Sequence, residues 1–122
     1  LKANKISIFT PYTDEINQSL INYFKKENIE ISDLSYLNIA SDLDIGKIDP
    51  NYLFETLVNI DLSKSDALFI SCTALPVLSL IEDIEKKIGK IVLSSNQVLI
   101  WDTLKQVNLK DRILNYGELF KN

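Results

Sequence analysis

The sequence predicts an α/β domain with an open, mainly parallel four-stranded sheet and helices on both faces. Short apolar runs alternate with stretches of helical periodicity in the order βαβαβαβα, which is typical of parallel strands joined by right-handed crossovers. The chain has 122 residues, of which 46% are hydrophobic and 25% are charged. This length and composition indicate a single α/β domain over residues 1–122 with a core of its own.

The four predicted strands are the apolar runs at residues 5–10, 29–37, 67–71 and 91–94. The first, third and fourth runs are almost continuously apolar, as expected of strands that are covered on both faces. The second run alternates more between apolar and polar residues, which favours a place nearer an edge of the sheet.

Helices are predicted between the strands and after the last one. An amphipathic pattern over residues 13–27 predicts the first helix. Asp49 followed by Pro50 predicts the N-cap and the first position of the second, which runs to residue 60.

Proline and glycine set the predicted bounds of the third helix. Pro76 predicts its first turn, and Gly89 predicts its end just after Ile88. A last helix is predicted at about residues 96–107.

Charge and composition exclude several classes of function. The formal net charge of −4 leaves no basic surface to neutralise phosphates, so we do not expect nucleic acid as a partner. The absence of histidine removes Ser-His-Asp catalysis and HExxH zinc sites from this chain, and we expect no metal. None of the 3 glycines lies in a strand-to-helix turn, which argues against a dinucleotide or nucleoside triphosphate site.

The sequence also favours a soluble, cytoplasmic protein without a membrane segment. Its one cysteine cannot form an internal disulfide, and no apolar run is long enough to span a bilayer. The chain contains no methionine and begins with leucine. We therefore expect a piece of a longer protein or a processed product.

Polar residues follow each predicted strand, at residues 10–12, 37–44, 71–74 and 94–96. In open parallel sheets, ligands bind beyond the carboxyl ends of the strands. Hydroxyl groups, amides and free backbone N–H groups at this edge suit a small anion, above all a carboxylate. The only arginine, Arg112, lies near the far terminus, so backbone amides would have to hold the negative charge.

Cys72 is the most informative of these residues. A cysteine placed after a buried strand and before the N-terminus of a helix is favoured as a thiolate, which suits proton transfer or nucleophilic attack. The alternative is that Cys72 is a small buried hydrophobic residue.

The other candidates also have structural alternatives. Tyr12 could simply pack its ring, Ser95 and Asn96 could serve the cap of the last helix, and Asp42 could be a solvated turn residue. The acidic and basic residues at positions 82–87 predict an exposed helix face without chemistry.

Three segments carry a resemblance to a known family: residues 10–17 (TPYTDEIN), residues 68–75 (LFISCTAL) and residues 94–97 (SSNQ) with Trp101 after them. Together they resemble the C-terminal half of the maleate cis-trans isomerase and arylmalonate decarboxylase group of the aspartate/glutamate racemase superfamily. The Ser-Cys-Thr-Ala-Leu version is also similar to the ectoine-utilisation proteins of this group.

This resemblance implies one Rossmann-like half of a two-domain racemase-type fold. The missing N-terminal domain would be a partner across the active site, and a homo-oligomer stays open. The family uses no cofactor and no metal, because a pair of cysteines, one from each domain, acts on a small carboxylate substrate. Cys72 would be the second of that pair.

The resemblance also implies substrate-binding residues. Tyr12 would bind the substrate together with the backbone amides of Thr73 and Ala74. Ser95 and Asn96, after the fourth strand, are further candidates. Family isomerases hold a carboxylate with an asparagine after the second strand, and here Asn38 and Asp42 compete for that place.

Two features bear on the reaction. Thr73 and Ala74 stand where the decarboxylase branch has two glycines, which favours the isomerase branch. If Asp42 is the counterpart of the family asparagine, its charge would repel a second carboxylate and argue against maleate.

Three functions remain open from the sequence. The first is half of a cofactor-independent isomerase or racemase, inactive by itself. The second is a non-catalytic carboxylate-binding module that lacks the partner cysteine. The third is a structural domain with an inert thiol.

Overall fold

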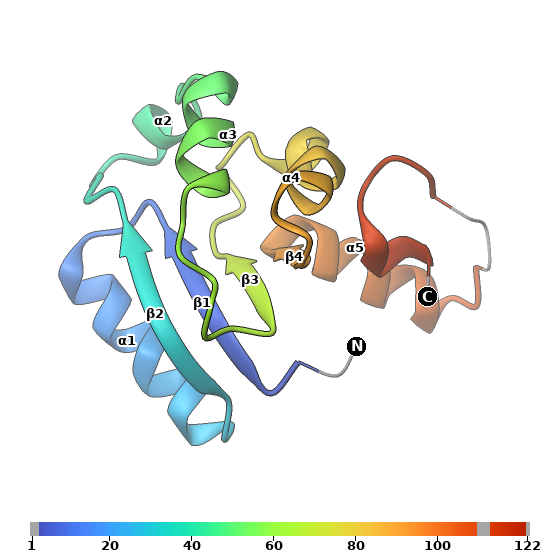
Figure 1. The fold of residues 1–122 in the computed structure, drawn as a ribbon, viewed down its shortest axis with the longest axis horizontal. Coiled ribbons are helices and arrows are strands. Elements are labelled where there is room, and N and C mark those ends of the chain that lie inside the picture. Colours follow the sequence, from blue (N-terminus) through green and yellow to red (C-terminus); the bar gives the residue numbers. More distant parts are fainter. Residues whose placement is uncertain (1–2, 110–112, 122) are drawn as a thin grey trace.

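The fold is a four-stranded parallel sheet covered by helices, seen in a computed structural model that describes residues 3–109 and 113–121 (Figure 1). The strands lie in the order β2-β1-β3-β4, and every neighbouring pair is parallel. The predicted architecture is therefore confirmed, and so is the edge position of the second strand. The strands are β1 (Lys5–Thr10), β2 (Glu30–Tyr36), β3 (Ala67–Ile70) and β4 (Ile91–Ser94).

The four predicted helices are present, and the described chain adds a short helix α2 and two 3-10 helices, η1 and η2. In Figure 1 the arrowheads of β1, β2 and β3 point toward the end of the molecule where α2 and α3 lie. The helices are α1 (Asp14–Lys26), α2 (Asp42–Ile45), α3 (Pro50–Val58), η1 (Leu78–Leu80), α4 (Ile81–Ile88), α5 (Ser95–Gln106) and η2 (Glu118–Lys121).

The core is divided between the two faces of the sheet. Alternation along β1 directs Ile6 and Ile8 to one face, where they belong to a cluster that includes Leu20 and Phe24 of α1. Phe9 belongs to a larger cluster with the buried residues of α3 and α4. Full burial of one such side chain contributes about 1.5–3 kcal/mol, so these contacts fix the sheet between its helices.

The third predicted helix begins later than Pro76, and this prediction was wrong. The side chains on both sides of the proline, Leu75 and Val77, are buried, each at 2% exposure. Val77 N–H donates to the Leu75 carbonyl at 2.9 Å, which closes a tight turn around Pro76. Because this turn has to bury both neighbours, the chain enters α4 only at Ile81, after η1. Gly89 ends α4 as predicted, in a left-handed conformation with φ of 67°.

Asp49 caps α3, as the sequence predicts. Its Oδ1 accepts hydrogen bonds from Asn51 N–H at 2.8 Å and from Tyr52 N–H at 3.0 Å. Pro50 takes the first helical position, where no N–H is needed. This cap sets the start of the helix that carries the fully buried Leu53.

We predict that Asp49→Ala lowers the free energy of unfolding by about 1 kcal/mol, because two helix N–H groups lose their acceptor. Asp49→Asn keeps a side-chain oxygen and is the matched control, expected within about 0.5 kcal/mol of the wild type. Urea unfolding followed by circular dichroism measures both. Equal stability of the alanine variant and the wild type would show that the cap contributes nothing.

Candidate functional site

The candidate site lies where the strand order reverses. The chain passes from β1 to β2 on one side and then crosses to β3 on the other side of β1. The loops that follow β1 and β3 therefore lead to helices on opposite faces of the sheet, α1 and α4, which is the arrangement at which open parallel sheets bind ligands. Ser71 N–H donates to the Phe9 carbonyl at 2.9 Å, so the two loops depart from adjacent points. Tyr12 and Cys72 belong to these two loops.

Two buried polar side chains hold the loop that carries Tyr12. Thr10 Oγ1 donates to Asn17 Oδ1 at 2.6 Å and accepts from Tyr12 N–H at 3.2 Å. Asn17 Nδ2 donates to the Tyr12 carbonyl at 3.3 Å. Thr10 and Asn17 are both 0% exposed, so this network is shielded from water. Sequence reasoning missed the role of both residues, although they belong to the segment that carries the family resemblance.

The Tyr12 hydroxyl lies beside the Cys72 thiol. Burial raises the pKa of Tyr12 above its usual value, and hydrogen bonding with Cys72 raises it further. The nearby Ser71 hydroxyl acts in the opposite direction, while the charge of Asp42 also raises this pKa. The structure therefore brings Tyr12, Cys72, Ser71 and Asp42 together. At neutral pH the phenol keeps its proton and is a hydrogen-bond donor.

Cys72 is a buried free thiol, exposed by only 6%. Its N–H donates to Ser95 Oγ at 3.2 Å, and its sulfur accepts from Ala74 N–H at 3.4 Å. The predicted helix N-terminus next to Cys72 is absent, because residues 73–80 separate the thiol from α4. The sulfur therefore receives one backbone hydrogen bond, from Ala74 N–H, and does not lie at the N-terminus of a helix.

The first turn of α5 supports the loop after Cys72. Asn96 Nδ2 donates to the Thr73 carbonyl at 3.0 Å. Thr73 itself is exposed, and its N–H meets no acceptor within residues 3–109 and 113–121. Thr73 therefore offers the free backbone donor expected for a carboxylate pocket, whereas the Ala74 N–H is directed at the sulfur.

Asn38 and Asp42 occupy different positions in the segment after β2. Leu37 N–H donates to the Thr10 carbonyl at 3.1 Å, and Ile39 N–H donates to the Pro11 carbonyl at 2.8 Å. Asn38, between these two bonds, is exposed with a φ of 59°. Asp42 begins α2 and is close enough for its charge to act on Tyr12.

Glu85 corrects the prediction of an exposed, inert helix face. Its carboxylate is partly buried and accepts from Val92 N–H at 2.9 Å and from Glu118 N–H at 2.8 Å. Burial raises the pKa of this carboxyl, and the two N–H donors act against that rise. Glu85 therefore joins α4 to β4 and to η2. Glu85 is one of three acidic residues in this charged run, and nothing in the sequence distinguished it from Glu82 and Asp83.

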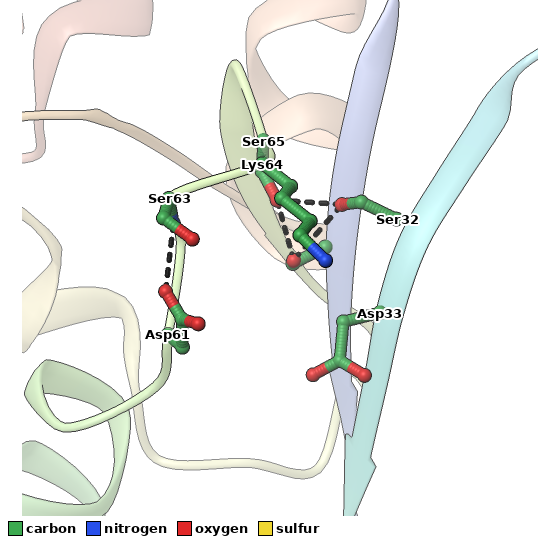
Figure 2. A pocket seen from close by; sticks show the side chains of 7 residues that line it. Ser32, Asp33, Asp61, Ser63, Lys64 and Ser65 are labelled. Atoms are coloured by element: carbon green, nitrogen blue, oxygen red, sulfur yellow. Dashed lines mark hydrogen bonds between the residues drawn. The ribbon is translucent and has the colours of Figure 1, made fainter.

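A separate polar cavity of about 220 Å³ lies near the amino ends of the strands, away from the predicted site residues (Figure 2). The hydroxyls of Ser7, Ser32 and Ser65 meet there, with the two bonds to Ser65 at 2.6 Å. Figure 2 shows Ser32 of β2 and Ser65, just before β3, directed toward one another. These three hydroxyls pair with each other.

The described part of the chain forms neither a metal site nor a membrane span. Within residues 3–109 and 113–121, no group of 3 or more histidine, cysteine or acidic residues could hold a metal ion. Each described helix is too short or too polar to cross a lipid bilayer. Arg112 lies outside the described residues.

Comparison with known proteins gives relatives along the whole chain. A maleate isomerase from Geobacillus stearothermophilus is 34% identical over 98% of this chain and 48% of its own length. A cysteine-to-serine mutant of Nocardia farcinica maleate cis-trans isomerase with a covalently bound succinylcysteine intermediate superposes with a TM-score of 0.90 at 27% identity, over 97% of this chain and 49% of that one. Maleate isomerase Iso from Pseudomonas putida S16 gives a TM-score of 0.91 at 26% identity, over 97% and 48%.

The chain thus spans about half the length of the curated relatives it matches. The family model described as arylmalonate decarboxylase matches residues 1–120. Both the sequence relatives and the superposed structures extend over the segments that carry Tyr12, Cys72 and Ser95. The chain belongs to the arylmalonate decarboxylase family, which agrees with the resemblance seen in its sequence.

Proposed function

We propose that this chain forms one half of the active site of a cofactor-independent isomerase that acts on a small dicarboxylate of the maleate type. The observation that carries this proposal is the meeting of the Cys72 thiol and the Tyr12 hydroxyl at the reversal point of the sheet. Membership of a family with maleate isomerases among its relatives supports the choice of reaction. The other half, with a second cysteine, would come from a domain that faces this edge.

The proposed reaction needs no redox change. The thiolate of the opposing cysteine adds to one alkene carbon, so a C–S bond forms and the π bond breaks. Cys72 gives its thiol proton to the neighbouring carbon. Rotation about the new single bond follows, Cys72 takes a proton back, and the C–S bond breaks to leave the trans alkene. A succinylcysteine, as found in the Nocardia farcinica structure, is the species in which the neighbouring carbon carries the added proton.

The residues around Cys72 have separate tasks in this proposal. The Tyr12 hydroxyl and the Thr73 N–H donate to carboxylate oxygens, where negative charge builds when the thiolate adds. Ser95 and Asn96 hold the backbone of Cys72 and Thr73 in place. The charge of Asp42 acts on Tyr12, so it disfavours a second carboxylate near that side chain and orients the substrate away from α2.

We predict that the 122-residue chain alone does not isomerise maleate, whereas a protein that joins it to its opposing half does. Proton NMR of maleate and fumarate measures both reactions. Cys72→Ser in the joined protein should abolish turnover, because a serine hydroxyl is a far weaker acid than a thiol. Turnover by the chain alone that is lost in Cys72→Ser would contradict the half-site, and a fully active Cys72→Ser joined protein would contradict the role of the thiol.

We predict that Tyr12→Phe lowers kcat/KM of the joined protein by about 10- to 150-fold, because one charge-assisted hydrogen bond of about 1.5–3 kcal/mol is lost. The melting temperature should stay unchanged, since the ring and its packing remain. Tyr52→Phe, at a tyrosine exposed by 55%, is the matched control with unchanged kinetics. An unchanged kcat/KM with a lower melting temperature in Tyr12→Phe would make Tyr12 a structural residue.

A further inference from the structure

Gln97 joins the first turn of α5 to the C-terminal segment of residues 115–121. Its side chain is fully buried, at 0% exposure. The side-chain oxygen accepts from Ser94 N–H at 3.2 Å, and Nε2 donates to the Tyr116 carbonyl at 2.7 Å. Ser94 Oγ in turn accepts from Gln97 N–H at 3.3 Å, which completes a capping box. One amide side chain therefore serves both the helix cap and the C-terminal segment.

The C-terminal segment is seated closely against this amide. Gly117 has a φ of 92°, a conformation that favours glycine. A Cβ atom at this position would lie 2.7 Å from Ile81 Cγ2, 3.0 Å from Gln97 Nε2 and 3.1 Å from Glu85 Oε2. The bond from Glu118 N–H to Glu85 holds the next residue of the segment. The segment thus fits between α4 and α5 without room for a side chain at Gly117.

The same turn of α5 holds the backbone of Cys72 and Thr73. Ser95 Oγ accepts from Cys72 N–H, and Asn96 Nδ2 donates to the Thr73 carbonyl. Gln97 follows these two residues directly. A shift of this turn would therefore move the acceptor of Cys72 N–H and the donor to the Thr73 carbonyl. The loop that contains these two residues lies in no helix or strand.

We propose that Gln97 is a positioning residue for Cys72, and that the segment 115–121 is the support against which it acts. The amide fixes the first turn of α5 between its cap and the C-terminal segment, and this turn fixes the Cys72 loop. The catalytic consequence rests on the proposed function, whereas the coupling between segment and thiol does not.

Gln97→Glu separates the two tasks of the amide. A carboxylate still accepts from Ser94 N–H, so the capping box remains, but it cannot donate to the Tyr116 carbonyl and repels that oxygen. Gly117→Ala displaces the segment from the other side through the contact with Ile81. If Gln97→Glu does not fold, Gly117→Ala alone tests the coupling between the C-terminal segment and Cys72. Ile8→Val, in the core cluster of the opposite face, is the control for a general loss of stability.

The probe is alkylation of Cys72 by iodoacetamide in the 122-residue chain, which has a single thiol. We expect the rate to rise by at least about fivefold in Gln97→Glu and in Gly117→Ala, because local opening exposes the buried sulfur. Amide hydrogen exchange at Cys72 should accelerate in parallel, and Ile8→Val should alkylate at the wild-type rate. Wild-type rates in both test variants, or an equal rise in Ile8→Val, would overturn the proposal.

A second readout concerns catalysis in the joined protein. Loss of positioning predicts that Gln97→Glu lowers kcat by about 10- to 100-fold with a smaller change in KM, because the thiol is misplaced while Tyr12, which Thr10 and Asn17 hold separately, still donates to the substrate. If the wild-type joined protein turns over maleate and Gln97→Glu has the same kcat, the positioning role is wrong. The alkylation rates need no substrate, so they test the coupling even where the joined protein does not turn over maleate.

Discussion

The position of β1 between β2 and β3 is the constraint on which the rest of the structure depends. Because β1 pairs in parallel with a strand on each side, its carboxyl end is central, and the loops after β1 and β3 start from adjacent points. Every candidate site residue lies in a loop or first turn at this edge of the sheet. The buried apolar residues of both faces make this arrangement rigid, so chemistry can be left to short polar segments.

Those segments are held by buried polar side chains rather than by regular structure. Thr10 and Asn17 fix the backbone of Tyr12, and Gln97 fixes the turn that supports Cys72. Each of these amide or hydroxyl groups is hydrogen-bonded inside the fold, which offsets the cost of removing it from water. The same bonds fix the conformation of the loops. The loops that carry the thiol and the phenol are thus tied by side-chain hydrogen bonds to the end of β1 and to the first turns of α1 and α5.

Local signals in the sequence were sufficient for much of the fold. Apolar runs located the strands, Asp49 with Pro50 located the start of α3, and Gly89 located the end of α4. The start of the third helix was predicted wrongly because a proline suits a tight turn as well as a first helical turn. Which of the two forms at Pro76 depends on the burial of both neighbouring side chains.

The site was predictable only in part. Residues after the strands could be named from topology, and among them Tyr12 and Cys72 have side chains that interact. Glu85 and Gln97 each have one partner at residues 116–118, far along the chain, so no local pattern could reveal the link to the C-terminal segment. The choice between Asn38 and Asp42 likewise depends on how the segment after β2 folds back over β1.

We propose that a dicarboxylate binds beside Tyr12 and Cys72, at the carboxyl edge of the sheet. The most direct test is the rate of Cys72 alkylation in the 122-residue chain with increasing succinate, against equal ionic strength of chloride. We expect succinate to slow alkylation in a saturable manner and the neutral diamide of succinate to leave the rate unchanged. Equal rates with succinate, with the diamide and with chloride would contradict it.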